Sequence, residues 1–300
     1  MLVIKFDFRA DLVEHIDSSL VQLGYSINAL GVERDNVSRY LMLLIKALRR
    51  VPAAKSRRVV MARGFVVPPD STAGFKMLLK AIEQGSALRP WLSKTVTDPT
   101  FRDGLLDDWG IHHFHLGPTM DRKAAAFVSR TEVVAFAVVR PDVVYFLIAT
   151  GHHSRKAPLV WTQTDLIDIT HQNWPALITT PKSKPPGQAL TAERHAEIRE
   201  MRVNVGVTVS DGTVYYPPGG GSMSNGDGAL DYIYQMQLFR SVDGRENAVR
   251  ANEVQIRAAL KLRADCELAL KARYEIAFPE GFDIRIFESV SSVEVRLEAS

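Results

Sequence analysis

The segment from Asp108 to Ile148 constrains the fold most, because it contains closely spaced runs of β-branched and aromatic residues. The runs are GIHHFHLG, AAFVSRTEVVAFAVVR and DVVYFLIAT, and an Arg-Pro-Asp tripeptide supplies a tight connection between the last two. Short runs of this composition, separated by turn residues, are typical of β-strands joined by tight turns. We therefore expect an antiparallel meander of three strands in this segment.

The flanking sequence alternates between helical and extended patterns. Before the meander, the patterns predict a strand at 2–8, helices at 10–24 and 35–50, a strand at 57–69 and a helix at 71–86. After it, they predict a helix at 161–174 that ends at Trp174-Pro175, and a hairpin at 202–218 that turns at Asp211-Gly212. Two helices at about 229–241 and 246–264 and alternating strands at 270–278 and 282–287 complete the chain.

These patterns predict an α+β fold, with a mixed N-terminal α/β layer, an antiparallel β-meander and a separate C-terminal α+β domain. The expected catalytic region is 1–178, made of a basic α/β part at 1–107 and a histidine-rich meander and helix at 108–178. A linker rich in proline and lysine is expected at 179–191, and the C-terminal domain at 192–300.

Composition narrows the class of protein. Hydrophobic residues make up 46% and charged residues 24% of the 300 residues, which is ordinary for a globular chain. No run of 18 apolar residues occurs, and the N-terminus lacks the pattern of a secretory signal. A single cysteine, Cys266, excludes an internal disulfide and a cysteine zinc cluster. We expect a cytoplasmic protein with no membrane partner.

Positive charge is concentrated in one segment. Between Asn36 and Pro69 there are eight basic and no acidic residues, although the net charge of the chain is only +3. Such a segment can attract the phosphates of a nucleic acid, or it can simply be a solvated face. The residues expected to bind a substrate strand are Arg49, Arg50, Lys55, Arg57 and Arg58.

Histidines are clustered around the meander. Six of the eight lie within 60 residues: His112, His113, His115, His152, His153 and His171. Side chains alternate along a strand, so His113 and His115 share one face, and His112 shares the other with Phe114 and Leu116. A neighbouring pair of imidazoles is suited to general acid–base catalysis near neutral pH, although a one-residue bulge would exchange the two faces.

Three further residues are candidates for the same site. Arg130 on the middle strand offers a planar donor for a phosphate, and His153 follows the end of the third strand. His171 shares a helix face with Ile167 and Trp174, which would bring it to the sheet. Each histidine could instead be a structural residue with its hydrogen bonds satisfied.

Metal binding is a competing use of the His-x-His pattern. His113 and His115 could bind zinc or another divalent metal, with His152, His153, Asp107 or Asp121 completing the site. No HExxH, phosphate-binding loop or GxSxG motif occurs. We expect no cofactor, with the metal site as the alternative.

The run RTEVVAFAVVRPDVVYFLIATGHHS resembles the terminal hairpin of RelE-like toxin ribonucleases, in which a strand bearing arginine turns into a strand ending in Gly-His. It is also similar to other small metal-independent ribonucleases, including colicin-type and EndoU-like domains. The motif LLDDWGIHHFHLG is similar to that of a bacterial family often found with mobile elements, which implies no activity. The ribonuclease resemblance implies that Arg130 stabilises the phosphate and that His113 or His115 is the base.

The sequence therefore predicts a histidine-dependent, metal-independent endoribonuclease of toxin or anti-phage type that cleaves RNA by 2′-OH attack. One alternative is a metal-dependent phosphoesterase or nuclease using His113 and His115. Another is a non-enzymatic nucleic-acid-binding or regulatory protein with structural histidines. The C-terminal domain is open to oligomerisation or to a protein partner.

Overall fold

The chain folds into two compact units. The computed structural model describes residues 4–101, 103–151, 163–178, 182–183, 190–191, 194, 197–198, 204–218, 220–221, 223, 227–263 and 265–296. Unit 1 comprises Met1–Leu48 with Asp231–Ser300, and unit 2 comprises Arg49–Leu230. The predicted α+β class is confirmed, but the structure divides the chain differently from the predicted 1–178 and 192–300. Most of the expected linker at 179–191 lies outside the described residues.

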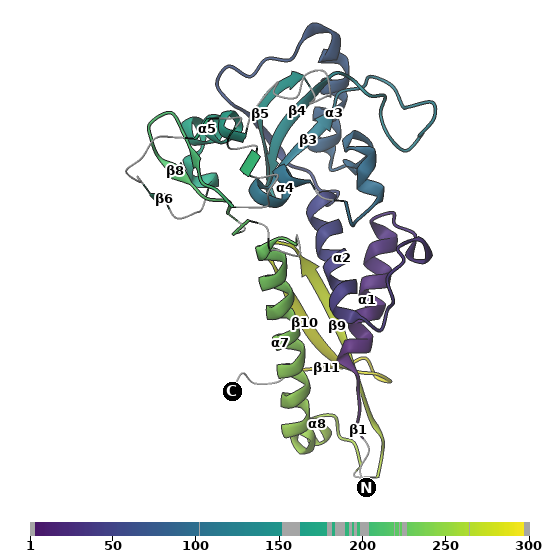
Figure 1. Cartoon of the computed structure of the whole chain (residues 1–300). Coiled ribbons are helices and arrows are strands. Elements are labelled where there is room, and N and C mark those ends of the chain that lie inside the picture. The colour runs from purple at the N-terminus through teal and green to yellow at the C-terminus, as the bar shows by residue number, and fades with distance from the viewer. Residues whose placement is uncertain are drawn as a thin grey trace. The chain divides into compact units, whose positions relative to one another are not determined.

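Unit 1 is built from both ends of the chain (Figure 1). Its four-stranded sheet has the order β1-β9-β10-β11. Its elements are β1 (Ile4–Lys5), α1 (Phe8–Gln22), a 3₁₀ turn (Ile27–Ala29), α2 (Val37–Arg50, whose last two residues belong to unit 2), α7 (Ala229–Ala251, whose first two belong to unit 2), α8 (Glu253–Ala259), β9 (Leu268–Ala277), β10 (Gly281–Glu288) and β11 (Glu294–Val295).

Contacts between the two ends of the chain explain the boundary of unit 1. Ile4 of β1 pairs in parallel with Leu268 of β9. The carboxylate of Asp11 accepts a hydrogen bond from the backbone N–H of Ala272 at 2.7 Å. Helix α7 packs along the β9–β10 hairpin, where the ring of Tyr234 lies against aromatic residues of that hairpin (Figure 1). The N-terminal segment therefore belongs with the C-terminal strands, which a division by sequence order misses.

Unit 2 contains the predicted meander. Its main sheet has the order β2-β5-β4-β3, and a smaller sheet has the order β6-β8-β7. Its elements are β2 (Arg58–Met61), α3 (Thr72–Gln84), α4 (Gly104–Trp109), β3 (Ile111–His115), β4 (Val133–Val139), β5 (Val143–Gly151), α5 (Gln163–Asn173), β6 (Lys182–Ser183), β7 (Val207–Thr208) and β8 (Val214–Tyr215), with 3₁₀ turns at Pro69–Ser71, Arg89–Trp91, Lys94–Thr97 and Pro175–Leu177.

The main sheet is packed on both faces. Strands β3, β4 and β5 run antiparallel as predicted, and β2 pairs in parallel with β5 (Figure 1). On one face, the rings of Phe75 and Phe114 each pack near Phe146. On the other face, Phe136 and Trp109 belong to a buried cluster that also includes residues of α5 and the β7–β8 hairpin. The sheet is therefore the centre of the unit 2 core.

Several predicted elements have different limits in the structure. Of the strand expected at 2–8, residues 2 and 3 lie outside the described residues and Ile4–Lys5 form β1. Phe8 already belongs to α1, which Asp7 caps by accepting from the N–H of Ala10. The helices expected at 229–241 and 246–264 are α7, which runs on through Gly244, and the short α8. The hairpin expected at 202–218 lies in unit 2, where Val207 and Val209 join the apolar cluster of the meander.

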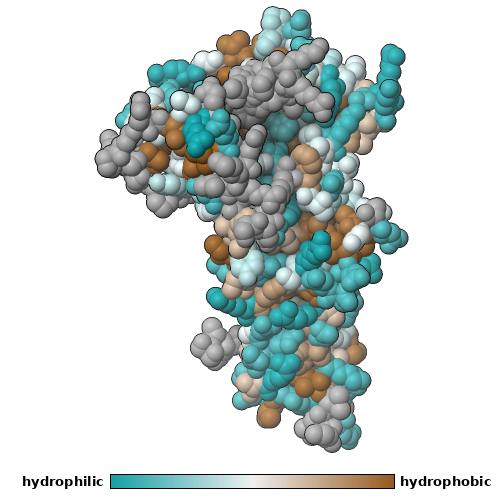
Figure 2. All heavy atoms as spheres, viewed as in Figure 1, coloured by the Kyte–Doolittle hydropathy of each residue, from teal (hydrophilic) through white to brown (hydrophobic). Residues whose placement is uncertain are grey.

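The surface is mixed in character. On the face seen in Figure 2, hydrophilic residues predominate over unit 1 and hydrophobic residues are scattered among them. Among the residues that the structure describes, no helix is both long enough and apolar enough to cross a membrane.

Candidate functional site

Strand β3 carries three histidines at the edge of the main sheet. The helix before it, α4, is capped by Asp103, and Gly110 ends it in a left-handed conformation with a φ of 66°. The chain then enters β3 at Ile111. A short helix with a glycine stop thus determines where the histidine strand begins.

The predicted alternation of the histidines is confirmed. The rings of His113 and His115 lie 5.9 Å apart between centroids, and those of His112 and Phe114 lie 6.0 Å apart. His115 is only 4% exposed, whereas 18% of the His113 side chain is exposed. Of the two histidines on this face, His113 is the one that solvent reaches.

A carboxylate lies beside His113. The Oδ2 atom of Asp103 is 3.7 Å from Nδ1 of His113, and 21% of the Asp103 side chain is exposed. The cap itself holds Asp103 in place, because its Oδ1 accepts from the N–H of Leu106 at 3.3 Å. The two groups are too far apart for a hydrogen bond, but a carboxylate at this distance attracts a protonated imidazole, which suits the pair to general acid–base chemistry.

His112 has a different environment. Its Nε2 lies 3.2 Å from the backbone oxygen of Arg49. Since a carbonyl only accepts, Nε2 carries the hydrogen and its N–H donates a hydrogen bond to this oxygen. Burial lowers the pKa of His112 to about 4, against which the nearby Asp103 acts in the opposite direction. His112 is therefore neutral at pH 7 and has a structural role.

A small cavity of about 20 Å³ lies between Asp103, His112 and His113 and the 3₁₀ turn at Lys94–Thr97. Six of the residues that line it are Arg50, Ser93, Thr95, Asp103, His112 and His113. The Nδ1 atom of His112 finds no hydrogen-bond partner among the described residues. A cavity of this size accommodates one water molecule.

Three of the five basic residues expected to bind a substrate are buried and bonded within the protein. Arg49 pairs with Asp107 at 3.1 Å. Arg50 donates to the carbonyls of Asp98 and Thr95, and Arg57 donates to three backbone carbonyls. These guanidinium groups satisfy polar backbone groups in loops, so the interpretation of Arg49, Arg50 and Arg57 as a substrate surface is corrected.

The other two are on the surface. Lys55 is exposed and forms an ion pair with Asp142 at 2.6 Å. Arg58 is exposed at the start of β2. These two remain accessible to an anionic ligand.

The remaining predicted residues do not converge on His113. Arg130 is exposed in the segment that precedes β4, and not within the strand as expected, because β4 begins at Val133. His171 lies on α5, where its Nδ1 is 2.7 Å from the Tyr215 hydroxyl and its Nε2 is 3.4 Å from Asp211. His152 and His153 lie outside the described residues.

The loop that joins β3 to β4 carries accessible positive charge. Arg122, Lys123 and Arg130 are exposed, and none of their side chains forms an ion pair within the part of the chain that the structure describes. The same loop is tied to the wall of the small cavity, because Asp121 pairs with Lys94 at 2.7 Å. Of these three cations, the sequence analysis identifies only Arg130 as a candidate. Together they can attract an anion.

The described residues contain no group of three or more histidine, cysteine, aspartate and glutamate side chains arranged to hold a metal ion. The carboxylates expected to complete a metal site, Asp107 and Asp121, pair with Arg49 and Lys94.

A scan against protein-family models and searches of curated proteins and of solved structures found no match for this chain.

The sequence reasoning missed Asp103. Its signal was present, because an aspartate three residues before a leucine in a short apolar helical segment is typical of a helix N-cap. Nothing in the sequence indicated that Tyr215 and Asp211 contact His171, since these contacts join segments more than 35 residues apart.

Proposed function

We propose that the edge of β3 is an acid–base site that cleaves RNA without a metal ion, with His113 as the residue that transfers the proton. The observation that carries this proposal is the pair formed by His113 and Asp103, 3.7 Å apart and both partly exposed. Exposure gives a substrate access to the ring, and the carboxylate stabilises the imidazolium that proton transfer creates. His115 packs against His113 from within the core and is a positioning residue.

The reaction needs one proton to be taken and one returned. His113 takes the proton of a ribose 2′-hydroxyl, and the 2′ oxygen attacks the neighbouring phosphorus. The bond from phosphorus to the 5′ oxygen then breaks, and the imidazolium returns its proton to that oxygen. The products are a 2′,3′-cyclic phosphate and a 5′-hydroxyl, so atoms and charges balance without a metal or an external cofactor.

The loop cations provide the affinity for RNA in this proposal. Arg122, Lys123 and Arg130 are exposed and unpaired among the described residues, and each phosphate that they neutralise releases counterions. In this proposal Arg130 contributes to the affinity for RNA from the loop, together with Arg122 and Lys123, and does not stabilise the reacting phosphate beside His113.

Cleavage of a mixture of single-stranded and structured RNA by the purified protein tests the proposal. Wild-type protein should produce 2′,3′-cyclic phosphate ends with and without EDTA. His113→Gln should lose about 10² to 10⁴ in rate. Asp103→Asn keeps the cap acceptor for Leu106 but removes the charge, and it should lower kcat with KM unchanged. The matched control is His171→Gln, whose contacts lie with Tyr215 and Asp211, and it should retain the wild-type rate.

Two outcomes would contradict this mechanism. Loss of cleavage in EDTA would favour the metal-dependent phosphoesterase. Equal cleavage by wild type and a folded His113→Gln variant would place the chemistry elsewhere. Tryptophan fluorescence serves as the folding control, because all four tryptophans lie within Arg49–Leu230.

A second candidate function, RNA binding without cleavage, is favoured by the unpaired loop cations. In that case wild type would bind RNA and leave it intact, and His113→Gln would bind equally well. Replacing Arg122, Lys123 and Arg130 by alanine would weaken binding. It would also make the plot of log affinity against log salt shallower, by about 0.7 for each phosphate that is no longer neutralised.

The biological role of the proposed activity rests on the resemblance of the hairpin to toxin ribonucleases. An action as a toxin or anti-phage effector in the cytoplasm, where RNA is accessible, stays a prediction. Induction of wild type and of His113→Gln in a bacterial host tests it, since only wild type should arrest growth.

A further inference from the structure

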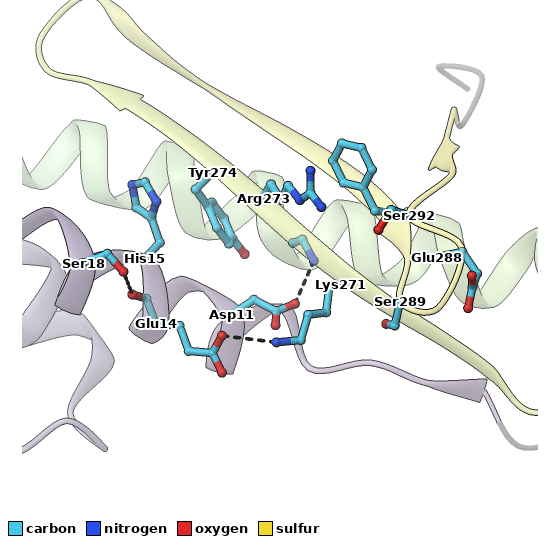
Figure 3. Close-up of a pocket in the computed structure, with 12 residues that line it drawn as sticks. Asp11, Glu14, His15, Ser18, Lys271, Arg273, Tyr274, Glu288, Ser289 and Ser292 are labelled. Carbon is cyan, nitrogen blue, oxygen red and sulfur yellow. Dashed lines mark hydrogen bonds and ion pairs between the residues drawn. The ribbon is translucent and has the colours of Figure 1, made fainter.

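A cavity within unit 1 shares no lining residue with the small cavity beside His113. Its volume is about 400 Å³, which falls within the range of ligand pockets. Helix α1 lines one side and β9 lines the other, with the end of β10 closing it (Figure 3). The side chains that matter most come from these two elements: Asp11, Glu14 and His15 from α1, and Lys271, Arg273 and Tyr274 from β9.

Some polar groups of this cavity are already paired. Lys271 forms an ion pair with Glu14 at 3.2 Å (Figure 3). Glu288 accepts hydrogen bonds from the backbone N–H and the hydroxyl of Ser291 in the turn that follows β10. The Tyr274 hydroxyl donates to a backbone carbonyl at 2.5 Å. These paired groups form part of the cavity wall. The groups that can still bind a ligand are Arg273 and the carboxylate of Asp11.

The β9 side offers a site for an anion. The guanidinium carbon of Arg273 lies 4.1 Å from the centroid of the Phe287 ring, in a cation–π contact. Among the described residues it has no carboxylate partner. The hydroxyls of Ser289 and Ser292 line the same cavity and are further donors. A planar arginine fork with neighbouring hydroxyl donors is suited to a carboxylate, which it can bind through two parallel hydrogen bonds.

The α1 side offers a site for a cation. One oxygen of the Asp11 carboxylate accepts from the backbone N–H of Ala272 at 2.7 Å, while its second oxygen accepts no hydrogen bond from the described residues (Figure 3). Burial raises the pKa of Asp11, and the N–H of Ala272 and the nearby Lys271 act in the opposite direction. A ligand ammonium would donate to the second oxygen of the carboxylate. The rings of His15 and Tyr274, 5.9 Å apart between centroids, form an aromatic wall beside this carboxylate.

We propose that this cavity binds a small zwitterion of the amino acid or dipeptide class, with the ligand carboxylate on Arg273 and its ammonium on Asp11. Arg273 and Asp11 have opposite charges and line one cavity. A ligand that carries both charges pairs with both groups, whereas a ligand that lacks either loses one ion pair, at the exposed Arg273 or at the half-buried Asp11. This requirement makes the site selective for zwitterions over amines, acids and neutral peptides.

Calorimetric titration of the full chain tests the proposal. The probes are phenylalanine, arginine, glycyl-phenylalanine and phenylalanyl-glycine, each compared with its N-acetylated and its amidated form. At least one zwitterion should bind with a stoichiometry of one, and blocking either end should weaken binding by about tenfold or more. Arg273→Gln should remove the dependence on the carboxylate, and Asp11→Asn, which keeps an oxygen for the N–H of Ala272, should remove the dependence on the ammonium.

Arg285→Gln is the matched control. Arg285 pairs with Arg273 in the register of β9 and β10, has a half-exposed side chain and lies near Asp283 at 3.5 Å, outside the cavity. This variant should bind like wild type. Absence of binding for all four zwitterions would overturn the proposal. Equal binding of free and blocked forms, or equal loss in Arg285→Gln and Arg273→Gln, would overturn it as well.

Discussion

Replacing His112 by glutamine tests how the titration of this buried side chain contributes to the pH dependence of the free energy of unfolding. His112 is 8% exposed, and burial lowers its pKa from the usual 6.5 to about 4. The folded protein therefore holds this proton less tightly than the unfolded chain, and unfolding takes up a proton between these two pH values. The stabilisation is fully present above pH 6.5 and is lost as the pH falls towards 4. The difference in pKa corresponds to about 3 kcal/mol in the free energy of unfolding.

Glutamine keeps a donor for the carbonyl of Arg49 but does not titrate. At pH 7.5 we expect His112→Gln to be less stable than wild type by about 1 to 2 kcal/mol, because the ring no longer fills its site beside Phe114. As the pH falls, wild type should lose about 3 kcal/mol more than the variant, so the difference should vanish and then reverse. The other titrating groups are present in both proteins, so the difference reports His112 together with its interactions with Asp103 and His113.

Urea unfolding at pH 7.5, 5.5 and 4.5, followed by tryptophan fluorescence, measures this difference. All four tryptophans, including Trp109 in the core beside β3, lie within Arg49–Leu230, so the signal reports unit 2. A difference between the two proteins that stays constant across this pH range would refute the reasoning. It would mean that His112 titrates alike in the folded and the unfolded chain.

Three further substitutions test the packing. Gly74→Ala should destabilise unit 2 by about 3 kcal/mol, because the new Cβ would lie 1.9 Å from the backbone oxygen of Leu116; urea unfolding would show it. Gly244→Ala has open space around the new methyl group and should raise stability by about 1 kcal/mol, read as a higher Tm by circular dichroism. Tyr215→Phe removes the 2.7 Å hydrogen bond to His171 from a fully buried tyrosine and should cost about 1 to 2 kcal/mol in the fluorescence assay.

The parts of the fold that depend on neighbouring residues could be predicted from the sequence. The turn at Arg140-Pro-Asp joins β4 and β5, and the N–H of Arg140 donates to the carbonyl of Val143. Gly85 ends α3 with a φ of 72°, as its place after the apolar pattern indicates. Turn and cap residues act through local backbone geometry, so their effect is visible in a short stretch of sequence.

The assembly of the units could not be predicted in the same way. The pairing of Ile4 with Leu268 joins residues 264 positions apart. A two-residue strand such as β1 has too short a pattern to identify its partner. The proline-rich stretch before 202–218 predicts that this hairpin belongs to the C-terminal domain, but Val207 and Tyr215 belong to the apolar cluster over β4. Burial of apolar surface, and not proximity in sequence, determines which segments form a unit.

The basic segment shows why residue type alone misassigned part of the site. A run of arginines attracts attention as a nucleic-acid surface, yet Arg57 uses its guanidinium to bond the carbonyls of Ala53, Lys55 and Arg140. Irregular backbone leaves carbonyls without partners, and a buried arginine can satisfy several of them at once. A sequence shows the number of donors but not the number of unpaired carbonyls nearby, so the two uses of arginine look the same until the loop is folded.

The two adjacent histidines of β3 also show that residue type alone does not determine which side chain can act in catalysis. His112 and His113 are identical in type and neighbours in sequence, and the register of β3 on β4 is regular, with His113 opposite Phe136. The irregularity in this region lies between β4 and β5, at Phe136 and Ala137, so it leaves the faces of β3 unchanged. His112 is consequently held neutral against a backbone carbonyl, while His113 meets Asp103 at a partly exposed edge. A bulge between β3 and β4 would exchange these two environments. The register of β3, more than the histidines themselves, therefore decides which ring is able to transfer a proton.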